Sequence, residues 1–237
     1  MRVLDIDLDF FLADCCPLAA PGERPVLSGH EPWEPERVRA FLEGQCHLSA
    51  ARPKPGAIFE THDGTLAYWL KRIEEGSLTA PFWVTHVDAH SDLGIGRPGP
   101  GYVLNTVLTL KPDLRLDIGR YYRQRQLDEA NYLLFALALR LISELDNVRN
   151  PRSRPDIPRE LLMDGQSDLI RLSSFPQQLM QGVNGPEPLV PFHVYDDYTR
   201  FEAQGEYDFV TVAISPRYAP READALLDVL KAYIRQE

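Results

Sequence analysis

Acidic and imidazole side chains are concentrated in one short segment, Asp88-Ala89-His90-Ser91-Asp92, which follows a run of mostly apolar residues. A buried strand does not normally end in acid, imidazole and acid, because an unpaired buried charge costs several kcal/mol. In open parallel sheets, ligands bind at the carboxyl ends of the strands. The spacing therefore favours a polar site at a strand end, and an exposed polar turn is the alternative interpretation.

Three more carboxylates alternate with apolar residues at the N-terminus, at Asp5, Asp7 and Asp9. Alternate residues of a strand share a face, so a strand over residues 2–11 would place all three on one side. Like charges on one face repel each other, which requires a cation between them, either Lys or Arg or a divalent ion. A solvated edge strand would also tolerate this row, but the apolar residues between the acids indicate a central strand.

A third polar group, Glu60-Thr61-His62-Asp63, lies where a strand is expected to lead into a helix. A lone histidine at such a junction more often caps or packs than binds a metal, so His62 is a candidate ligand because of the two other groups. Mixed Asp and His ligation with several carboxylates suits Mn²⁺ and, less well, Zn²⁺ or Fe²⁺. About four carboxylates are too many for one zinc ion, and they fit two ions that activate a water between them.

Strands and helices must bring these groups together. Strands are predicted over residues 2–11, 56–62, 81–88 and 208–214. Helices are predicted from residue 35 onward and over residues 63–75, 127–145 and 220–236, and loops over residues 17–35, 94–101 and 150–158. Strand, helix and strand with short joins are typical of a parallel sheet. We expect one α/β domain over residues 1–237, a three-layer α/β/α sandwich with a mostly parallel central sheet.

Charge and composition narrow the possible partners. Lys and Arg total 25 and Asp and Glu total 35, so the formal net charge is −10. A general nucleic-acid binder normally shows a basic stripe on its surface, so this acidic net charge excludes that class. The same charge is compatible with a cationic substrate or with bound metal ions. No segment approaches the roughly 20 apolar residues that cross a bilayer. The three cysteines lack paired spacing, and the N-terminus does not match a signal peptide, so we expect a cytoplasmic protein without membrane partners.

The segment Asp88-Ala-His90-Ser-Asp92 resembles the DAHxD motif of the arginase/agmatinase (ureohydrolase) superfamily, in which a histidine ends the preceding strand, as His62 does here. The remaining ligands of that superfamily come from an SxDxD strand late in the chain. Here the matching strand is the N-terminal DIDLDFF segment. This order resembles the UPF0489 family, whose bacterial members include peptide arginases, which convert arginine side chains of ribosomally made precursor peptides to ornithine.

The resemblance implies an arginase-like fold and two Mn²⁺ ions per chain. His62, Asp88 and Asp92 with one N-terminal Asp would hold one ion, and His90 and Asp88 with two N-terminal Asp would hold the other. By analogy, a hydroxide between the ions attacks the guanidinium carbon, Asp92 accepts its hydrogen bond, and urea leaves.

The N-terminal pair is assigned to Asp7 and Asp9, because ligands are expected at the carboxyl end of the strand. Asp5 would then lie one step deeper and support the ligands. The pair Asp5 and Asp7 is the alternative assignment.

Two features of free-arginine arginases are missing. Those enzymes carry a proton-shuttling histidine after DAHxD and a glutamate on the last strand that binds the guanidinium, but residues 94–110 contain no histidine and residues 210–216 contain no acid. The candidates for these roles are His193 as a catalytic residue and Glu60, Asp196 and Asp197 as substrate-binding residues. Asp196-Asp197 is also typical of a solvated turn. A substrate held by its peptide backbone would not need the contacts that bind a free amino acid.

We therefore expect a hydrolase that acts on guanidino C–N bonds, with a precursor peptide as substrate and ornithine and urea as products. One alternative is a deacetylase of the related fold with a single zinc ion. The other is a catalytically inactive protein that binds metal or peptide.

Overall fold

The computed structural model describes residues 1–94, 99–163 and 166–236. Within them, strands form one eight-stranded sheet in the order β5-β6-β4-β3-β1-β7-β2-β8. The strands are β1 (Arg2–Asp7), β2 (Lys54–Phe59), β3 (Phe82–Asp88), β4 (Ile142–Arg149), β5 (Leu169–Ile170), β6 (Val190–Tyr195), β7 (Phe209–Ala213) and β8 (Ile234–Gln236). Every neighbouring pair is parallel except β5 with β6. The predicted, mostly parallel sheet is confirmed.

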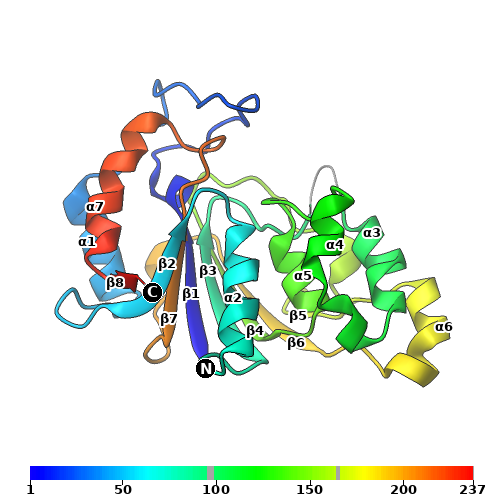
Figure 1. Ribbon diagram of the computed structural model, residues 1–237. Helices are drawn as coiled ribbons and strands as arrows, with labels where there is room; N and C mark the ends of the chain where they lie inside the picture. Colours follow the sequence, from blue (N-terminus) through cyan, green and yellow to red (C-terminus); the bar gives the residue numbers. More distant parts are fainter. Residues whose placement is uncertain (95–98, 164–165, 237) are drawn as a thin grey trace.

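Helices cover both faces of this sheet, which gives three layers (Figure 1). The α-helices are α1 (Pro35–Gly44), α2 (Gly64–Glu74), α3 (Gly101–Asn105), α4 (Ile118–Arg123), α5 (Tyr132–Ala138), α6 (Phe175–Asn184) and α7 (Leu227–Lys231). Short 3₁₀ helices are η1 (Leu8–Phe11), η2 (Val107–Thr109), η3 (Pro112–Arg115), η4 (Arg159–Leu161), η5 (Tyr198–Arg200) and η6 (Arg221–Leu226). Among the described residues, each helix is too short or too polar to span a bilayer.

The strand β1 divides two hydrophobic cores. Val3 faces the core that α2 and α5 cover, while Leu4 and Ile6 face the core that α1 and α7 cover. Figure 1 shows these two helix groups on opposite sides of the sheet. Because alternate residues of a strand point to opposite faces, Asp5 lies on the α2 and α5 side together with Val3. This central, doubly covered strand carries the first acidic group of the sequence.

The predicted strand over residues 2–11 is correct only as far as Asp7. The Asp7 carboxylate accepts a hydrogen bond of 3.0 Å from the backbone N–H of Asp9 and caps η1. The chain therefore turns after Asp7, and Asp9 reaches its place from a 3₁₀ turn. Phe10 and Phe11 are still buried after the turn. The apolar residues of the sequence therefore do not show that the strand has ended.

Two predicted helices are wrong in extent. The helix predicted over residues 127–145 is the short α5, because Arg140 adopts a φ of +60°, which does not continue a helix, and β4 follows from Ile142. The helix predicted over residues 220–236 is η6 followed by α7 and then β8, which pairs with β2. Both segments carry regularly spaced apolar residues, many of them buried, and this spacing did not show where a helix ends and a strand begins.

The other predicted elements agree with the structure. The helix from residue 35 and the segments over residues 56–62, 63–75, 81–88 and 208–214 correspond to α1, β2, α2, β3 and β7. The loops predicted over residues 17–35 and 150–158 are irregular apart from turns and an isolated bridge. Residues 95–98 of the third predicted loop lie outside the described residues.

Candidate metal centre

The ends of adjacent parallel strands bring the acidic groups together. In the register of β1 with β3, Asp5 lies beside His86, so Asp7 and Asp88 are the last residues of two neighbouring strands. His62 follows β2 on the far side of β7. We call the group Asp7, Asp9, His62, Asp88, His90 and Asp92 the strand-end cluster.

His62 faces three carboxylates in this cluster. Its Nδ1 lies 3.2 Å from Asp7 Oδ2, 3.1 Å from Asp88 Oδ2 and 3.0 Å from Asp92 Oδ2. All four side chains are at most about a tenth exposed. Within the described part of the chain, His62 Nδ1 and Asp88 Oδ2 are also buried without a hydrogen-bond partner. Four ligand atoms therefore converge on one point, and the hydrogen-bonding capacity of two of them is not satisfied.

His90 forms a second convergence with Asp9 and Asp88. His90 Nδ1 lies 3.0 Å from Asp9 Oδ2 and 3.5 Å from Asp88 Oδ1. The other Asp9 oxygen accepts from the backbone N–H of Ala89 at 3.2 Å, which fixes the carboxylate against the DAHxD turn. Asp88 directs one oxygen toward each convergence, so the two groups share this carboxylate.

The donor set fits divalent cations. Two ligands at right angles on an ion with bonds of about 2.1 Å are about 3.0 Å apart, which is close to the spacings around His62 and between His90 and Asp9. Together with Asp5, the region buries five carboxylates against His62, His86 and His90. Even with all three imidazoles protonated, negative charge remains in excess. These buried Asp and His groups could therefore hold metal.

Asp5 lies deeper and is fully engaged by other side chains. It accepts from His62 Nε2 at 3.0 Å, from Thr211 Oγ1 at 2.6 Å and from Thr65 Oγ1 at 3.2 Å, and Tyr132 also donates to it. Burial alone would raise the pKa of Asp5, but the charges of and hydrogen bonds from His62 and His86 hold that pKa below its ordinary value. A carboxylate that binds the far nitrogen of a histidine ligand fixes its tautomer and orientation, so Asp5 orients His62.

Two buried side chains in this region were missed by the sequence analysis. His86 Nε2 lies 3.3 Å from Asp88 Oδ2, and the Tyr132 hydroxyl lies 3.2 Å from both His62 Nε2 and His86 Nδ1. His86 had a sequence signal, since it precedes Asp88 by two positions and therefore shares its face of β3. Tyr132 had none, because it is the first residue of the apolar run that forms α5.

Burial and like charges raise carboxyl pKa values inside the cluster. Burial and the charge of Asp88 raise the pKa of Asp92 to about 7. Burial and the charges of Asp7 and Asp88 likewise raise the pKa of Asp9. Carboxyl groups held so close together without a cation resist full ionisation, which agrees with the excess of negative charge.

One residue of the cluster and one beside it adopt the left-handed backbone conformation that non-glycine residues seldom use. Asp92 has a φ of +50° and Ser215 has a φ of +46°. Ser215 donates its hydroxyl to Asp7 Oδ2. Such conformations persist where the surroundings enforce them, and they are concentrated at functional sites.

A small cavity opens onto the cluster. It is lined by Asp7, His62, His90 and Asp92, together with Glu129, Ser215 and Tyr218. The Glu129 carboxylate lies 3.4 Å from Arg217 Nη1, and the Tyr218 ring lies 4.8 Å from the His90 ring. Glu129 is a further residue that the sequence analysis missed, since it lies in a polar turn with no motif.

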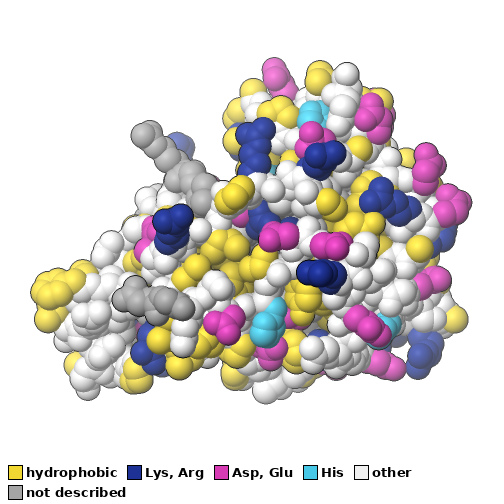
Figure 2. Space-filling model, turned by 180° about the vertical axis from the view of Figure 1, so that it is seen from behind, with side chains coloured by type: hydrophobic (Ala, Val, Ile, Leu, Met, Phe, Trp, Pro, Cys, Tyr) yellow, Lys and Arg dark blue, Asp and Glu magenta, His cyan; other side chains and the backbone are white. Residues whose placement is uncertain are grey.

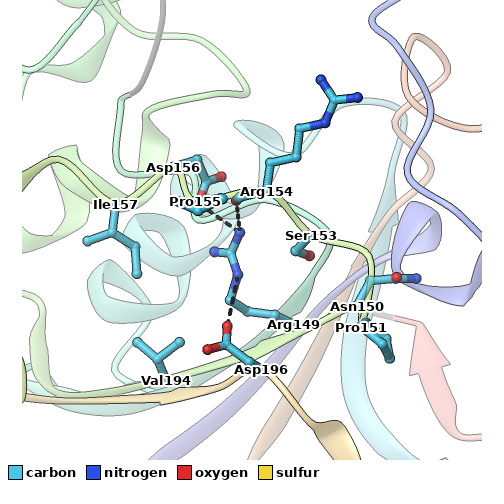
Figure 3. Close-up of a pocket in the computed structure, with 10 residues that line it drawn as sticks. All are labelled: Arg149, Asn150, Pro151, Ser153, Arg154, Pro155, Asp156, Ile157, Val194 and Asp196. Carbon is cyan, nitrogen blue, oxygen red and sulfur yellow. Dashed lines mark hydrogen bonds and ion pairs between the residues drawn. The ribbon is translucent and has the colours of Figure 1, made fainter.

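Further hollows continue from this cavity along the surface. Two that follow it share His90, Asp156 and Tyr218, and the last shares Arg154 and Asp156 with its neighbour. Figure 3 shows the last hollow, where Arg149 bridges Asp196 and the Asp156 segment, and Arg154 points away from both. We call this cavity and the neighbouring hollows together the groove.

The structure does not bring His193 to the strand-end cluster. Through the strand registers, His193 is aligned with Asp146, Thr85 and Leu4, three strand spacings or roughly 14 Å from β1. The side chains of these aligned residues point to one face of the sheet. Asp5 and His86 point to the opposite face, because they are the next residues after Leu4 and Thr85 along their strands. This position does not suit the proton-shuttle role predicted from the sequence.

The three predicted substrate-binding acids are also outside the cluster. Glu60 is exposed beyond the end of β2, and its carbonyl accepts from Ser215. Asp196 is 87% exposed and lies 3.9 Å from Arg149 in the distal hollow. Asp197 caps η5 through Thr199, which is the turn role given as its alternative. Of these acids, Asp196 alone lines the groove.

A comparison with known protein families finds no family that matches this chain, and a comparison with curated proteins finds no match either.

Proposed function

We propose that the protein is a dinuclear manganese hydrolase that converts arginine side chains of a ribosomally made precursor peptide to ornithine and releases urea. The observation that carries this proposal is the pair of ligand groups that share Asp88, with His62 on one side and His90 on the other. The DAHxD resemblance supplies the reaction class.

The two groups would hold one ion each. Asp7, His62, Asp88 and Asp92 would hold the first, and Asp9, Asp88 and His90 the second. Two divalent cations bound there would supply Lewis acidity and a water activated for attack. Asp5, which takes no part in the convergences, would keep His62 in its ligand tautomer.

Glu129 would bind the substrate guanidinium. It lines the cavity beside Asp92, and its contact with Arg217 supports a guanidinium at this carboxylate. Planar guanidinium and carboxylate groups pair through two parallel hydrogen bonds, which orients the carbon between them. An incoming arginine side chain would displace Arg217 and present its guanidinium carbon to the cluster.

Asp92 would carry the proton of the reaction. It borders the cavity, and by resemblance it accepts the hydrogen bond of the attacking water. The water oxygen bonds to the guanidinium carbon, the bond from that carbon to the side-chain nitrogen breaks, and the proton passes through Asp92 to that nitrogen. Urea and an ornithine side chain are the two products.

The groove supports a peptide over a free amino acid. The hollows share lining residues from the cavity as far as Asp196, so an extended chain could lie along them. Arg154, whose guanidinium points away from Arg149 and Asp196 in Figure 3, is available to a carboxylate of such a chain.

As expected from the sequence, we propose that the protein is cytoplasmic and that it has no nucleic-acid or membrane partner. The three cysteines are free thiols, which is compatible with a reducing compartment. On the face in Figure 2, Lys and Arg are scattered among Asp and Glu, and the visible described residues form no continuous basic stripe.

The test uses metal-loaded protein and arginine-containing peptides. Mn²⁺-loaded protein should release urea and lower the peptide mass by one carbon, two nitrogens and two hydrogens for each arginine converted, and Asp88→Asn should do neither. Glu129→Gln should lower kcat/KM by about tenfold to a hundredfold, since a charge-assisted hydrogen bond contributes roughly 1.5–3 kcal/mol. Free arginine and agmatine test the peptide requirement.

Specific results would contradict the proposal. One zinc ion per chain, with acetate released from acetyl-lysine peptides, would favour the deacetylase alternative. Peptide binding without any mass change at full Mn²⁺ occupancy would favour an inactive binding protein.

A further inference from the structure

A second group of metal-binding residue types lies on the other face of the sheet. Glu144 and Asp146 share a face of β4, and His193 is the partner of Asp146 in the register of β4 with β6. One ligand atom from each of the three lies within 4.8 Å of the others. This row includes Thr85 and Leu4, so it faces away from the strand-end cluster.

One oxygen of Asp146 is not satisfied by any described residue. The residue is 2% exposed, and its Oδ2 accepts from Trp83 Nε1 at 2.8 Å and from Thr85 Oγ1 at 3.2 Å. Its Oδ1 is buried and has no hydrogen-bond partner within residues 1–94, 99–163 and 166–236. Leaving a buried polar group unpaired is costly, and hydrogen bonds to one oxygen orient a carboxylate for a ligand on the other.

His193 and Glu144 supply the exposed side of this group. His193 Nε2 lies 3.3 Å from Glu144 Oε1, and the two side chains are 44% and 25% exposed. Two ligands of a tetrahedral ion with bonds of about 2.1 Å are roughly 3.4 Å apart, so this spacing fits a tetrahedral site. Solvent reaches the group from the side of His193, which leaves an entry path and a fourth position.

We propose that Glu144, Asp146 and His193 form a separate site for one divalent transition-metal ion of the zinc type. One imidazole and two carboxylates are donors that Zn²⁺ accepts in tetrahedral sites with an open position. The site is independent of the proposed hydrolase activity, because its residues face the other core and share no ligand with the strand-end cluster. It also gives His193 a role different from the one predicted from the sequence.

The first test counts metal ions per chain. Mn²⁺-loaded protein is dialysed against Zn²⁺, and the total of both metals is measured by mass spectrometry, so that exchange at the strand-end cluster leaves the total unchanged. His193→Gln should hold one ion fewer than the wild type. His47→Gln is the matched control, because His47 is 42% exposed and also has one carboxylate partner, Glu202 at 3.5 Å. Equal totals in the wild type and His193→Gln would overturn the proposal.

The second test uses the tryptophan beside the site. Trp83 Nε1 lies 2.8 Å from Asp146 Oδ2, so Co²⁺ bound at this site should quench the fluorescence of Trp83. The emission of Trp83 is obtained by subtracting the emission of Trp83→Phe from that of the wild type. Quenching should persist in Asp88→Asn and disappear in His193→Gln. Loss of quenching in Asp88→Asn, with retention in His193→Gln, would assign the Co²⁺ to the strand-end cluster and refute the second site. An inactive hydrolase would leave both readouts unchanged.

Discussion

Two buried charged regions of this molecule balance their charges in different ways. In the first, the Arg115 guanidinium is fully buried and donates to both oxygens of Glu187, at 2.8 and 3.0 Å, and Arg140 adds a contact of 3.2 Å. The remaining Arg115 hydrogen bonds go to backbone carbonyls. Every charged group in this region has a partner within the protein.

The strand-end cluster, by contrast, gathers carboxylates around histidines. Its ligand atoms converge on shared points, and His62 Nδ1 and Asp88 Oδ2 lack hydrogen-bond partners among the residues that the structure describes. The completed hydrogen bonds around Arg115 indicate a structural role. The unsatisfied atoms around His62 indicate a binding site for a cation, which the chain itself does not supply. The comparison separates the two roles although both regions are buried and charged.

The largest expected effect comes from removing one partner of the self-balanced region. Glu187→Ala leaves Arg115 buried without a counter-charge, and breaking a buried pair in this way costs about 3–5 kcal/mol. Chemical denaturation should show this loss in the free energy of unfolding. Glu206→Ala is the matched control, since Glu206 also faces two basic residues but on the surface, and it should change stability little. Equal losses in the two variants would break the comparison.

Metal bound at the strand-end cluster should stabilise the fold, whereas the described residues of the Arg115 region have no ligands left to bind metal. Mn²⁺ at a hundredfold its Kd should raise the free energy of unfolding by about 2.7 kcal/mol. Asp88→Asn should abolish this gain, because both ligand groups share Asp88. Without metal, Asp9→Asn should be at least as stable as the wild type, because it removes a charge that Asp7 and Asp88 repel. Thermal unfolding after chelation, with and without Mn²⁺, measures both effects. A metal-free Asp9→Asn protein much less stable than the wild type would show that the cluster is balanced internally.

A smaller effect is expected from the carboxylate that orients His62. Asp5→Asn should weaken Mn²⁺ binding by about tenfold to a hundredfold, as is typical when the partner of a metal-binding histidine is lost. Glu187→Gln is the buried control outside both proposed metal sites, and it should leave Mn²⁺ affinity at the cluster unchanged. Isothermal titration of both variants compares them directly, and an unchanged affinity in Asp5→Asn would remove Asp5 from the site.

The smallest effect concerns pH. Burial would raise the pKa of Glu187, but the hydrogen bonds and charges of Arg115 and Arg140 hold it below its ordinary value of 4.5. A carboxyl whose folded pKa is lowered stabilises the fold fully above its unfolded pKa, and this contribution is lost as pH falls through the folded value. Denaturation below pH 4.5 should therefore show a smaller decline for Glu187→Gln than for the wild type. A parallel decline in the two proteins would contradict the lowered pKa.

The parts of the fold and the site that could be predicted were encoded locally. Alternation around Asp5 and Asp7, and the placement of Asp88, His90 and Asp92 after an apolar strand, required only the rule that sites form at the carboxyl ends of parallel strands. His62 became a candidate through its position at such an end. These residues are the ones that the structure brings together.

The rest depended on contacts between distant segments. Tyr132 donates to Asp5 across 127 positions of the sequence, and the chain around Tyr132 resembles any buried helix. His193 was misplaced because β6 was not predicted, so neither its distance from β1 nor its face of the sheet could be derived. Glu129 lies in a turn whose position depends on α5, which the periodicity made too long.

The order of the strands also has a consequence for how the chain is made. β1 is synthesised before both of its neighbours in the sheet, β3 and β7, and Asp5 receives a hydrogen bond from Thr211, 206 positions later. The first carboxylates therefore leave the ribosome long before the strands that enclose them. Because contacts between distant segments form late in folding, the central strand must wait for nearly the whole described chain before it is enclosed on both sides.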